Sequence, residues 1–471
     1  MRSAEIIKSR IGNKKIAVLG LGVSNIPLVE LLLECGNDIT VHDKREISLL
    51  GDDAKKFEAL GVNFQTGESY LDKIDADVIF RSPGIRSDLG GIPEAVKRGA
   101  ILTSEMEMFF ELAPAKIIGI TGSDGKTTTT TITYKLLEKE FENTKRRVFV
   151  GGNIGTPLLS LVGDMTENDI AVIELSSFQL FTMKKSPWRA VLTNVSPNHL
   201  DWHTDMDEYT ATKSNIYKNG ASHLTTNAKN DICRKLCEDI GIDITLFSSV
   251  SSCDDIMKIS PSVNNVVYLK NGIICYFDGK NETEMLDTKD IVIPGIHNIE
   301  NYMAAISACW GLVSPETVRA IASTFGGVKH RLEFVRELDG VKYYNSSIDS
   351  SPTRTAAALS ALSCRPIVIC GGRDKNTPFE PLARALYERA RAVVLTGEAA
   401  EKIYDVLQNE GGEGKDLIIR IEKDFDSAVM FAKALANEGD TVLLSPACTS
   451  FDAFKNFEER GERFKKIVKG F

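Results

Sequence analysis

The chain has 471 residues, 43% of them hydrophobic and 26% charged, with a formal net charge of −9. These values predict a globular protein of about two to four domains, and the acidic balance argues against a nucleic-acid-binding protein. With no apolar run of about 18 residues and no signal-peptide core near the start, neither a membrane span nor export is expected.

Strand-like apolar runs alternate with helical stretches along the whole chain, which predicts an α/β fold with mostly parallel sheets. The nine cysteines are scattered and form no Cys-x-x-Cys pair. This pattern favours reduced thiols in a cytoplasm over a disulfide framework or a zinc site. Because ligands of open α/β sheets bind at the carboxyl ends of strands, the polar loops after predicted strands are the candidate binding sites.

The first α/β unit opens with KKIAVLGLGVSNIPLVELLLECG. Gly20 and Gly22 form a G-x-G turn after a strand, but Asn25 stands where the dinucleotide fingerprint has its third glycine. A second strand, DITVHD, ends at Asp43, where an acidic residue meets a ribose in that fingerprint. The pattern favours a nucleotide other than NAD, and a tight turn without a ligand is the alternative. Further on, DVIFRSPGI predicts a strand followed by a polar loop that begins at Ser82.

The second unit contains ITGSDGKTTTTTITYKLLEK, residues 120–139. Gly122 and Gly125 allow a tight loop whose N–H groups converge on an anion, just before a helix N-terminus. Lys126 adds a charge for the β- and γ-phosphates, and the hydroxyl of Thr127 is placed to bind Mg²⁺. The match is the shortened form T-G-x-x-G-K-T. A threonine-rich turn without a ligand is the alternative interpretation.

Three polar clusters follow this loop. VFVGGNIGTPL is a strand that runs into a glycine-rich turn around Asn153. DIAVIELSSFQL is an apolar strand that ends in Glu174, followed by Ser176, and a carboxylate there suits Mg²⁺. AVLTNVSPNHLDWH is another strand, and its polar end includes His199, which the crowding of polar groups makes a site candidate. The next helical pattern carries Lys213, which by itself is expected to be a solvated lysine.

The third unit begins near Lys329. RPIVICGGRDKNTPFEPLARAL predicts a strand, a Gly-Gly turn with Lys375, and a helix. DTVLLSPACTSFDAFKNFEERGERFKKIV predicts a strand, a short polar turn and a long amphipathic helix. The spacing of Phe451, Phe454 and Phe457 fits one face of that helix, and Phe454 is expected in the core.

Three motifs together resemble the Mur ligase family of ATP-dependent amide-forming enzymes: GITGSDGKTTT, ELSSFQL and PGIHNIENYMAA. The terminal LLSPACTSFDAFKNFEERGERF and the front LGLGVSN and SPGI segments are similar to the member that adds D-glutamate to UDP-N-acetylmuramoyl-L-alanine. The resemblance covers nearly the whole chain, in the family's order. It implies a monomeric cytoplasmic enzyme of peptidoglycan precursor synthesis, which acts through an acyl phosphate and releases ADP and phosphate.

The family also implies three domains: a Rossmann-like domain at 1–112 for the UDP-substrate, a central P-loop ATPase domain at 113–328, and a Rossmann-like domain at 329–471 for D-glutamate. The residues that the resemblance assigns to ATP are Gly122, Ser123, Asp124, Gly125, Lys126, Thr127, Thr128, Asn298, Asn301 and Arg331. Those assigned to two Mg²⁺ ions are Thr127, Glu174, His199 and Lys213, the last as a carbamate. Those assigned to the UDP-substrate are Gly22, Ser24, Asn25, Asp43, Lys44, Ser82, Asn153 and Ser176. Those assigned to D-glutamate are Ser350, Lys375, Ser450, Phe451 and Phe457.

Several positions depart from the family pattern. Ser346 stands where the family often has aspartate, Ile348 where many members have lysine, and Asn198 where aspartate is frequent; Arg373 also varies. None of these changes removes a residue of the phosphate loop or a residue assigned to a metal, so an active enzyme is expected. Its affinity for ATP can differ from that of other members. The alternatives are another ligase of the family, against which the terminal motif argues, and a nucleotide sensor that hydrolyses ATP slowly and forms no bond.

Overall fold

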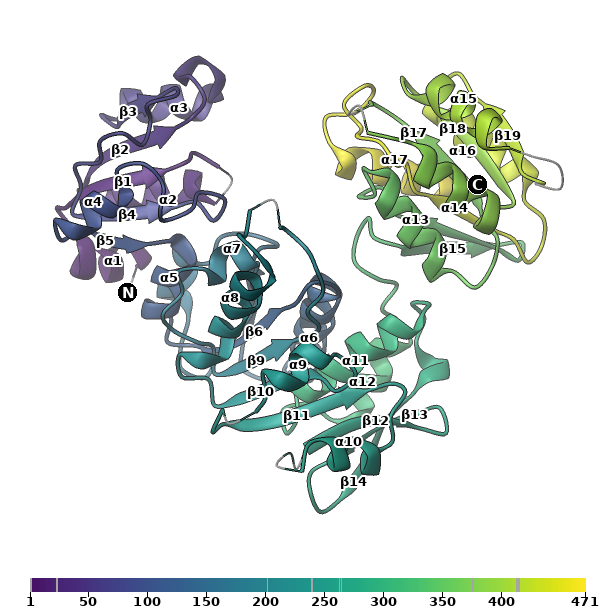
Figure 1. Ribbon diagram of the computed structural model, residues 1–471, viewed down its shortest axis with the longest axis horizontal. Helices are drawn as coiled ribbons and strands as arrows, with labels where there is room; N and C mark the ends of the chain where they lie inside the picture. Colours follow the sequence, from purple (N-terminus) through teal and green to yellow (C-terminus); the bar gives the residue numbers. More distant parts are fainter. Residues whose placement is uncertain are drawn as a thin grey trace. The chain divides into compact units, whose positions relative to one another are not determined.

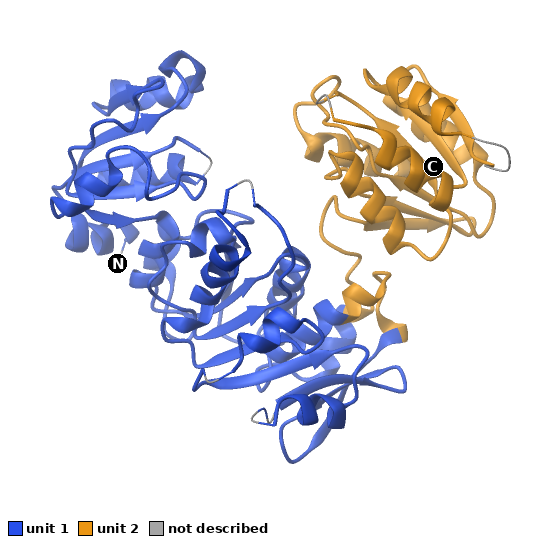
Figure 2. Cartoon of the chain, viewed as in Figure 1, with its two compact units in different colours: residues 1–288, 300–321 blue, residues 289–299, 322–471 orange. Residues whose placement is uncertain are grey.

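The computed structural model describes residues 2–22, 24–200, 202–238, 240–261, 263, 265–374, 377–411 and 416–471. It contains three sheets with helices around them (Figure 1), as the alternating sequence pattern predicted. The chain divides into two compact units, one of residues 1–288 and 300–321 and one of residues 289–299 and 322–471 (Figure 2). The first unit holds two of the sheets and the second unit holds the third.

The first sheet is five-stranded and parallel, in the order β3-β2-β1-β4-β5. The strands are apolar because both faces are covered; β1, for instance, is buried at four of its five positions. Its elements are α1 (Ser3–Ile11), β1 (Lys15–Leu19), α2 (Asn25–Glu34), β2 (Asp38–Asp43), the 3₁₀ helix η1 (Ile47–Leu49), α3 (Gly51–Ala59), β3 (Asn63–Thr66), β4 (Val78–Arg81), α4 (Ile92–Lys97), β5 (Ile101–Thr103) and α5 (Glu105–Leu112).

The central sheet has nine strands in the order β14-β13-β12-β11-β10-β9-β6-β8-β7. It is parallel from β7 to β12, and an antiparallel hairpin of β13 and β14 closes one edge. Its elements are β6 (Lys116–Thr121), α6 (Lys126–Glu140), β7 (Val148–Gly152), η2 (Leu159–Asp164), β8 (Ile170–Glu174), α7 (Ser177–Leu180), β9 (Arg189–Leu192), α8 (Met206–Lys218), β10 (His223–Asn227), α9 (Asp231–Lys235), β11 (Asp243–Ser248), α10 (Cys253–Ile259), β12 (Asn265–Lys270), β13 (Ile273–Phe277), β14 (Glu282–Asp287), η3 (Thr288–Asp290), α11 (Ile296–Ala308) and α12 (Pro315–Ala322).

One hydrophobic core joins the two sheets of the first unit. The same cluster of buried side chains includes Ile16 of β1, Phe109 of α5 and Ile173 of β8. Polar contacts add to it, since Glu105 of α5 accepts a hydrogen bond from the backbone N–H of Leu159 (2.8 Å). The shared core explains why these two sheets form a single compact unit.

The third sheet is six-stranded, in the order β15-β16-β20-β17-β18-β19, with only the β15–β16 pair antiparallel. Two hydrophobic clusters cover its two faces. Its elements are β15 (Glu333–Leu338), β16 (Val341–Asn345), α13 (Pro352–Ala361), β17 (Ile367–Gly371), α14 (Glu380–Arg389), β18 (Ala392–Thr396), α15 (Ala400–Glu410), β19 (Ile418–Ile421), α16 (Phe425–Leu435), β20 (Thr441–Leu444) and α17 (Phe457–Lys469).

The prediction that three phenylalanines share one face of the last helix is wrong. α17 begins only at Phe457, because Asn456 caps it by accepting a hydrogen bond from the backbone N–H of Glu459 (2.8 Å). Phe451 and Phe454 therefore lie in the turns before the helix. Phe454 still packs, with its ring 5.1 Å from that of Phe425.

All nine cysteines carry free thiols in this structure. Within the described ranges, no helix is both long and apolar enough to cross a membrane.

Candidate active site

The phosphate-loop sequence lies between β6 and α6 and turns at its glycines. Gly122 (φ 154°) and Gly125 (φ 78°) have positive φ, which side chains disfavour. A Cβ at Gly122 would collide with Thr193 Oγ1, and one at Gly125 with the side chain of Asn301. α6 begins at Lys126 without a side-chain cap, so the loop leads into the kind of helix N-terminus that binds phosphate.

Side chains that follow β9 hold this loop in place. Thr193 Oγ1 donates to the carbonyl of Asp124 (2.6 Å), and Asn194 Oδ1 accepts from its N–H (2.9 Å). Ser123 Oγ donates to the carbonyl of Ser196 (2.9 Å). These hydrogen bonds from the segment after β9 hold the loop in its conformation without a ligand.

Two lysines converge on one backbone oxygen of the loop. Lys126 Nζ donates to the carbonyl of Gly122 (3.0 Å), and Lys213 Nζ of α8 donates to the same oxygen (2.8 Å). Lys213 is only 1% exposed, so the expectation of a solvated helix lysine is wrong. Its burial, and then the charge of Lys126, lower the pKa of Lys213 to about 7. The loop is thus a centre of positive charge whose strength depends on pH.

The first turn of α6 and the end of β8 supply oxygen atoms. Thr127 is half-buried and Thr128 is 9% exposed. Glu174 ends β8 at 1% exposure, and Asn153 Nδ2 donates to its Oε1 (2.8 Å). Its second oxygen, Oε2, is buried and has no hydrogen-bond partner within the described ranges. A buried carboxylate oxygen without a donor suits a cation, since oxygen is the ligand that Mg²⁺ takes.

Ser176 has a structural task at the next helix. It caps α7, accepting a hydrogen bond from the N–H of Gln179 (3.2 Å), while the side chain of Gln179 accepts from the N–H of Ser176 (2.9 Å). This reciprocal pair fixes the N-cap of α7 two residues after Glu174.

His199 lies in a tight turn after β9. Its φ is 54°, and its carbonyl accepts hydrogen bonds from the N–H groups of Trp202 (3.1 Å) and His203 (3.0 Å). Its ring lies 4.8 Å from that of Phe178, in the helix next to Glu174. Asn198, one of the departures from the family pattern, is half-buried beside it.

The remaining residues assigned to ATP belong to different compact units. Asn301 is in the first unit, where its Oδ1 accepts from Thr129 Oγ1 of α6 (3.2 Å). Asn298 and Arg331 are in the second unit. Asn298 Nδ2 donates to the carbonyl of Pro294 (2.6 Å). Arg331 is half-buried in a tight turn, its N–H donating to the carbonyl of Val328 (3.0 Å).

The N-terminal glycine turn brings together four of its predicted residues. Asn25 Nδ2 donates to the carbonyl of Gly20 (2.8 Å) and to Ser82 Oγ (3.0 Å). Asp43 Oδ2 accepts the N–H of Leu21 (2.8 Å). These contacts join the ends of β1, β2 and β4.

Arg45 completes this turn and was missed by the sequence interpretation. Its Nε donates to Asp43 Oδ1 (2.9 Å) and its Nη2 to the carbonyl of Leu21 (3.0 Å). Although burial opposes the ionised form, the hydrogen bonds from Arg45 keep the pKa of Asp43 below its usual value. Three assigned residues lie at the surface of this turn: Gly22 and Lys44 are exposed and Ser24 is half-buried.

The residues assigned to D-glutamate are spread over the second unit. Ser450 is buried at 2% exposure, Ser350 and Phe457 are half-buried, and Phe451 is 59% exposed. Lys375 lies outside the described residues. Their assignment stays a prediction.

Two buried charged residues in this unit were missed. Arg460 of α17 donates to Ser347 Oγ (3.0 Å) and to the carbonyl of Cys448 (3.1 Å), and burial lowers its pKa to about 10. Asp349 accepts from Ser445 Oγ (2.8 Å), and burial raises its pKa to about 6. Ser346 stands where an aspartate was expected from the family pattern, and Asp349 places a carboxylate three residues later. The sequence could have indicated Arg460, because it lies four residues before Phe464 and therefore on the buried face of the amphipathic helix α17.

Comparison with known proteins identifies the family. Residues 120–309 match the model described as Mur ligase middle domain, and residues 330–448 match Mur ligase, glutamate ligase domain. A UDP-N-acetylmuramoylalanine--D-glutamate ligase of Acetivibrio thermocellus is 45% identical, over 98% of this chain and 97% of the relative. The ligase of the same name from Clostridium beijerinckii is 47% identical over 98% of both chains.

Solved structures with this fold come from other ligases. A UDP-N-acetylmuramoyl-L-alanyl-D-glutamate--2,6-diaminopimelate ligase aligns with a TM-score of 0.57 at 15% identity, over 98% of this chain and 93% of that one. The MurF ligase of Thermotoga maritima, in complex with ADP, aligns with a TM-score of 0.54 at 18% identity, over 98% and 97%. At these identities the likeness establishes the three-sheet fold alone.

Proposed function

We propose that this chain, which belongs to the Mur ligase family, joins D-glutamate to UDP-N-acetylmuramoyl-L-alanine and converts ATP to ADP and phosphate. The observation that carries the proposal is the near-full-length identity of 45% with a ligase of that name. The converging lysines and the buried Glu174 support the ATP-dependent half of the reaction.

The three sheets support the domain assignment. We assign residues 1–112 to the UDP-substrate, 113–328 to ATP and 329–471 to D-glutamate, because each range contains one complete sheet. The net charge of −9 gives no general attraction for anionic ligands. Binding must therefore come from local groups such as Lys126 and the loop N–H groups. The same resemblance supports a cytoplasmic monomer that acts on small molecules and not on nucleic acid.

The chemistry follows from the substrates. A carboxylate is a poor electrophile, and ATP supplies the phosphoryl group that turns the alanyl carboxylate into an acyl phosphate. The amine of D-glutamate then attacks the acyl carbon, and phosphate leaves. The chain contributes by orienting the reactants and by neutralising charge, through Lys126 and the N-terminus of α6.

The residues present fit Mg²⁺. No group of three or more His, Cys, Asp or Glu side chains is gathered as a metal site in the described part of the chain. Glu174 Oε2 and the Thr127 hydroxyl would hold one ion, and the phosphates of ATP would supply further oxygens. A second ion would be held by His199 and a carbamate on Lys213. Bound Mg²⁺ would supply positive charge at the phosphoryl oxygens.

The surroundings of Lys213 favour carbamate formation. The reaction joins the neutral amine to CO₂ through a new N–C bond and releases one proton. Lys213 is buried beside Lys126, and both conditions disfavour its ammonium form. The product carries two oxygens and a negative charge, which turns a cation into a ligand for Mg²⁺.

Phosphate release from ATP tests the proposal. The assay contains UDP-N-acetylmuramoyl-L-alanine and each candidate amino acid in turn. D-glutamate is expected to be required and L-glutamate to be rejected. Equal turnover with both enantiomers, or with another amino acid, would point to a different ligase of the family. Turnover without any dependence on an amino acid would support the nucleotide sensor.

A further inference from the structure

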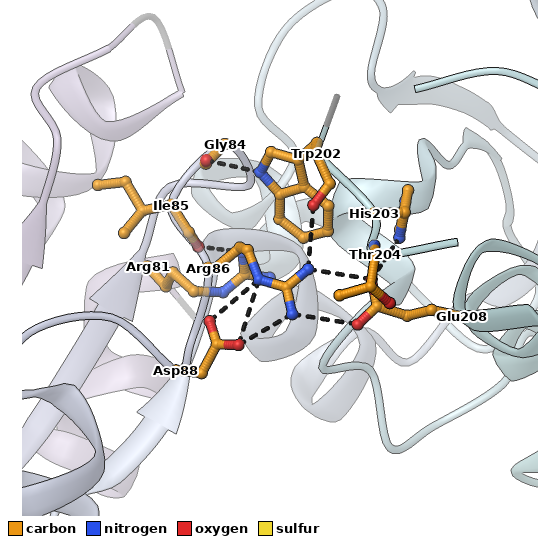
Figure 3. Close-up of polar contacts among 9 residues, drawn as sticks. All are labelled: Arg81, Gly84, Ile85, Arg86, Asp88, Trp202, His203, Thr204 and Glu208. Carbon is orange, nitrogen blue, oxygen red and sulfur yellow. Dashed lines mark hydrogen bonds and ion pairs between the residues drawn. The ribbon is translucent and has the colours of Figure 1, made fainter. Parts of the chain in front are cut away.

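Arg86 connects the loop after β4 to the turn that carries His199. Its guanidinium lies between Asp88 on its own loop and Glu208 in the first turn of α8 (Figure 3). Nη1 and Nη2 donate to the two oxygens of Glu208 at 3.0 Å each, and Nε donates to Asp88 Oδ1 (3.0 Å). Nη1 also donates to the carbonyl of Trp202 (3.0 Å). Nη2 also donates to Asp88 Oδ2 (2.9 Å), so all five N–H groups of Arg86 have acceptors. Lysine cannot reproduce the two-pronged contact with Glu208.

The cluster is packed as well as charged. The Arg86 side chain is only 17% exposed, and its guanidinium lies 5.0 Å from the rings of both Phe181 and Trp202. The Trp202 indole N–H donates to the carbonyl of Gly84 (2.9 Å). The loop after β4, which also holds Ser82, is thus joined to the turn after β9 at two points.

Glu208 also contacts the turn that carries His199. Its Oε2 accepts from the N–H of Thr204 (3.0 Å) and lies 3.2 Å from His203 Nδ1. Since Trp202 and His203 both donate backbone hydrogen bonds to the carbonyl of His199, a shift of either one moves His199 directly. The hydrogen bonds from Arg86 help to hold the pKa of Glu208 at about 2, so the carboxylate stays charged.

We propose that Arg86 is a positioning residue for the metal site: it fixes Glu208 and the Trp202 carbonyl, and through them the turn that presents His199. This inference rests on the proposed function of His199. The loop that carries Arg86 also holds Ser82, which is assigned to the UDP-substrate. Without Arg86, the loop after β4 keeps only the hydrogen bond between the Trp202 indole and the Gly84 carbonyl as its polar contact with this turn among those described here.

The test measures metal affinity without turnover. Mn²⁺ is titrated calorimetrically into the full-length protein saturated with β,γ-methylene-ATP. Arg86→Gln is expected to raise the Mn²⁺ dissociation constant by about 10-fold to 100-fold, the range found for residues that orient metal ligands. Glu208→Gln should also weaken Mn²⁺ binding, and the loss in the double variant should be smaller than the product of the two single losses, because the two side chains share one contact.

Arg147→Gln is the matched control. Arg147 pairs with the buried Asp169 (2.7 Å) at the amino ends of β7 and β8, the edge of the sheet away from the phosphate loop. It should lower the unfolding temperature and leave Mn²⁺ affinity unchanged. If Arg86→Gln does not fold, Arg86→Lys replaces it, since it keeps the charge and loses the two-pronged contact.

Unchanged Mn²⁺ affinity in the folded Arg86 variant, or losses that multiply in the double variant, would overturn the inference. Absence of D-glutamate-dependent phosphate release by the unaltered protein would instead overturn the proposed function. The two failures are distinguishable because the Mn²⁺ titration requires neither D-glutamate nor turnover.

Discussion

The first unit contains two glycine turns with similar sequences and different electrostatics. One joins β1 to α2 and the other joins β6 to α6, and each follows an inner strand whose two neighbours are parallel to it. In the turn after β6, the side-chain nitrogens of Lys126 and Lys213 converge on one carbonyl. In the turn after β1, a backbone N–H is already bonded to the carboxylate of Asp43.

This difference shows that glycine spacing specifies the path of a turn and not its ligand. Glycine permits the backbone conformation in both places, while side chains from neighbouring elements decide the charge. The turn after β6 is suited to a polyphosphate. The turn after β1 has no comparable excess of positive charge, because Asp43 is paired there with Arg45 (2.8 Å).

The sharpest way to break this comparison is Lys126→Ala. Turnover should fall by about 100-fold or more, because a group aimed at the developing charge is lost. Affinity for UDP-N-acetylmuramoyl-L-alanine, measured by calorimetry, should be nearly unchanged, since that ligand is assigned to the other turn. A parallel loss of UDP-substrate binding would show that the two turns do not act as separate sites.

Lys213 offers the second test, and its effect should depend on pH. Lys213→Ala should remove most activity without unfolding the protein, and Lys213→Glu should restore little because it is shorter than the carbamate. Only the neutral amine takes up CO₂, so the neutral fraction rises as pH increases through the lowered pKa of about 7. Enzyme depleted of CO₂ should therefore regain activity with bicarbonate more completely at about pH 8 than at about pH 6.

Full activity in thoroughly CO₂-depleted buffer would contradict the carbamate. So would a bare ammonium in an active state with bound Mg²⁺ and ATP. An unmodified lysine in metal-free protein would be compatible with both possibilities, because carbamate formation is reversible.

The sequence was sufficient to predict the alternation of strands and helices and the positions of both glycine turns. Local rules explain this success, since β6, the positive-φ glycines and α6 follow one another within a short stretch. The β13–β14 hairpin at the edge of the central sheet was not predicted, because its pairing depends on neighbours and not on a local motif.

Residues that act through long-range contacts were also missed. Arg86 and Arg460 each look like ordinary charged residues, and only the fold brings them to Glu208 and Ser347. Lys213 was misjudged from its helical pattern for the same reason. Burial depends on what packs against a helix, and a hydrophobic pattern does not reveal a lysine that points into a site.

A smaller effect is expected from Asp43→Asn, which changes the charge of the first turn and keeps its shape. The variant weakens the bonds with Leu21 and Arg45 by removing the carboxylate's charge. UDP-substrate affinity should fall by about 10-fold, or roughly 1.4 kcal/mol, as for a charged hydrogen bond. Calorimetry and steady-state kinetics check this, with an increased KM and little change in kcat. A large fall in kcat with normal affinity would place Asp43 in the chemistry instead.

The smallest effect on binding should come from Asn25→Gly, which restores the third glycine of the dinucleotide fingerprint. NAD binding at micromolar concentration is not expected, because the backbone N–H of Leu21 is still bonded to Asp43.

Asn25 is 2% exposed and donates to the carbonyl of Gly20 and to Ser82, so its loss should lower the stability of the fold. A decrease of about 1–3 kcal/mol in the free energy of unfolding, measured with urea, fits the loss of these bonds and the flexibility of glycine at the start of α2. UDP-substrate affinity should change by no more than about 3-fold, since the charge of the turn is unaltered. Micromolar NAD binding by the variant would mean that glycine spacing, and not the surrounding charge, selects the ligand.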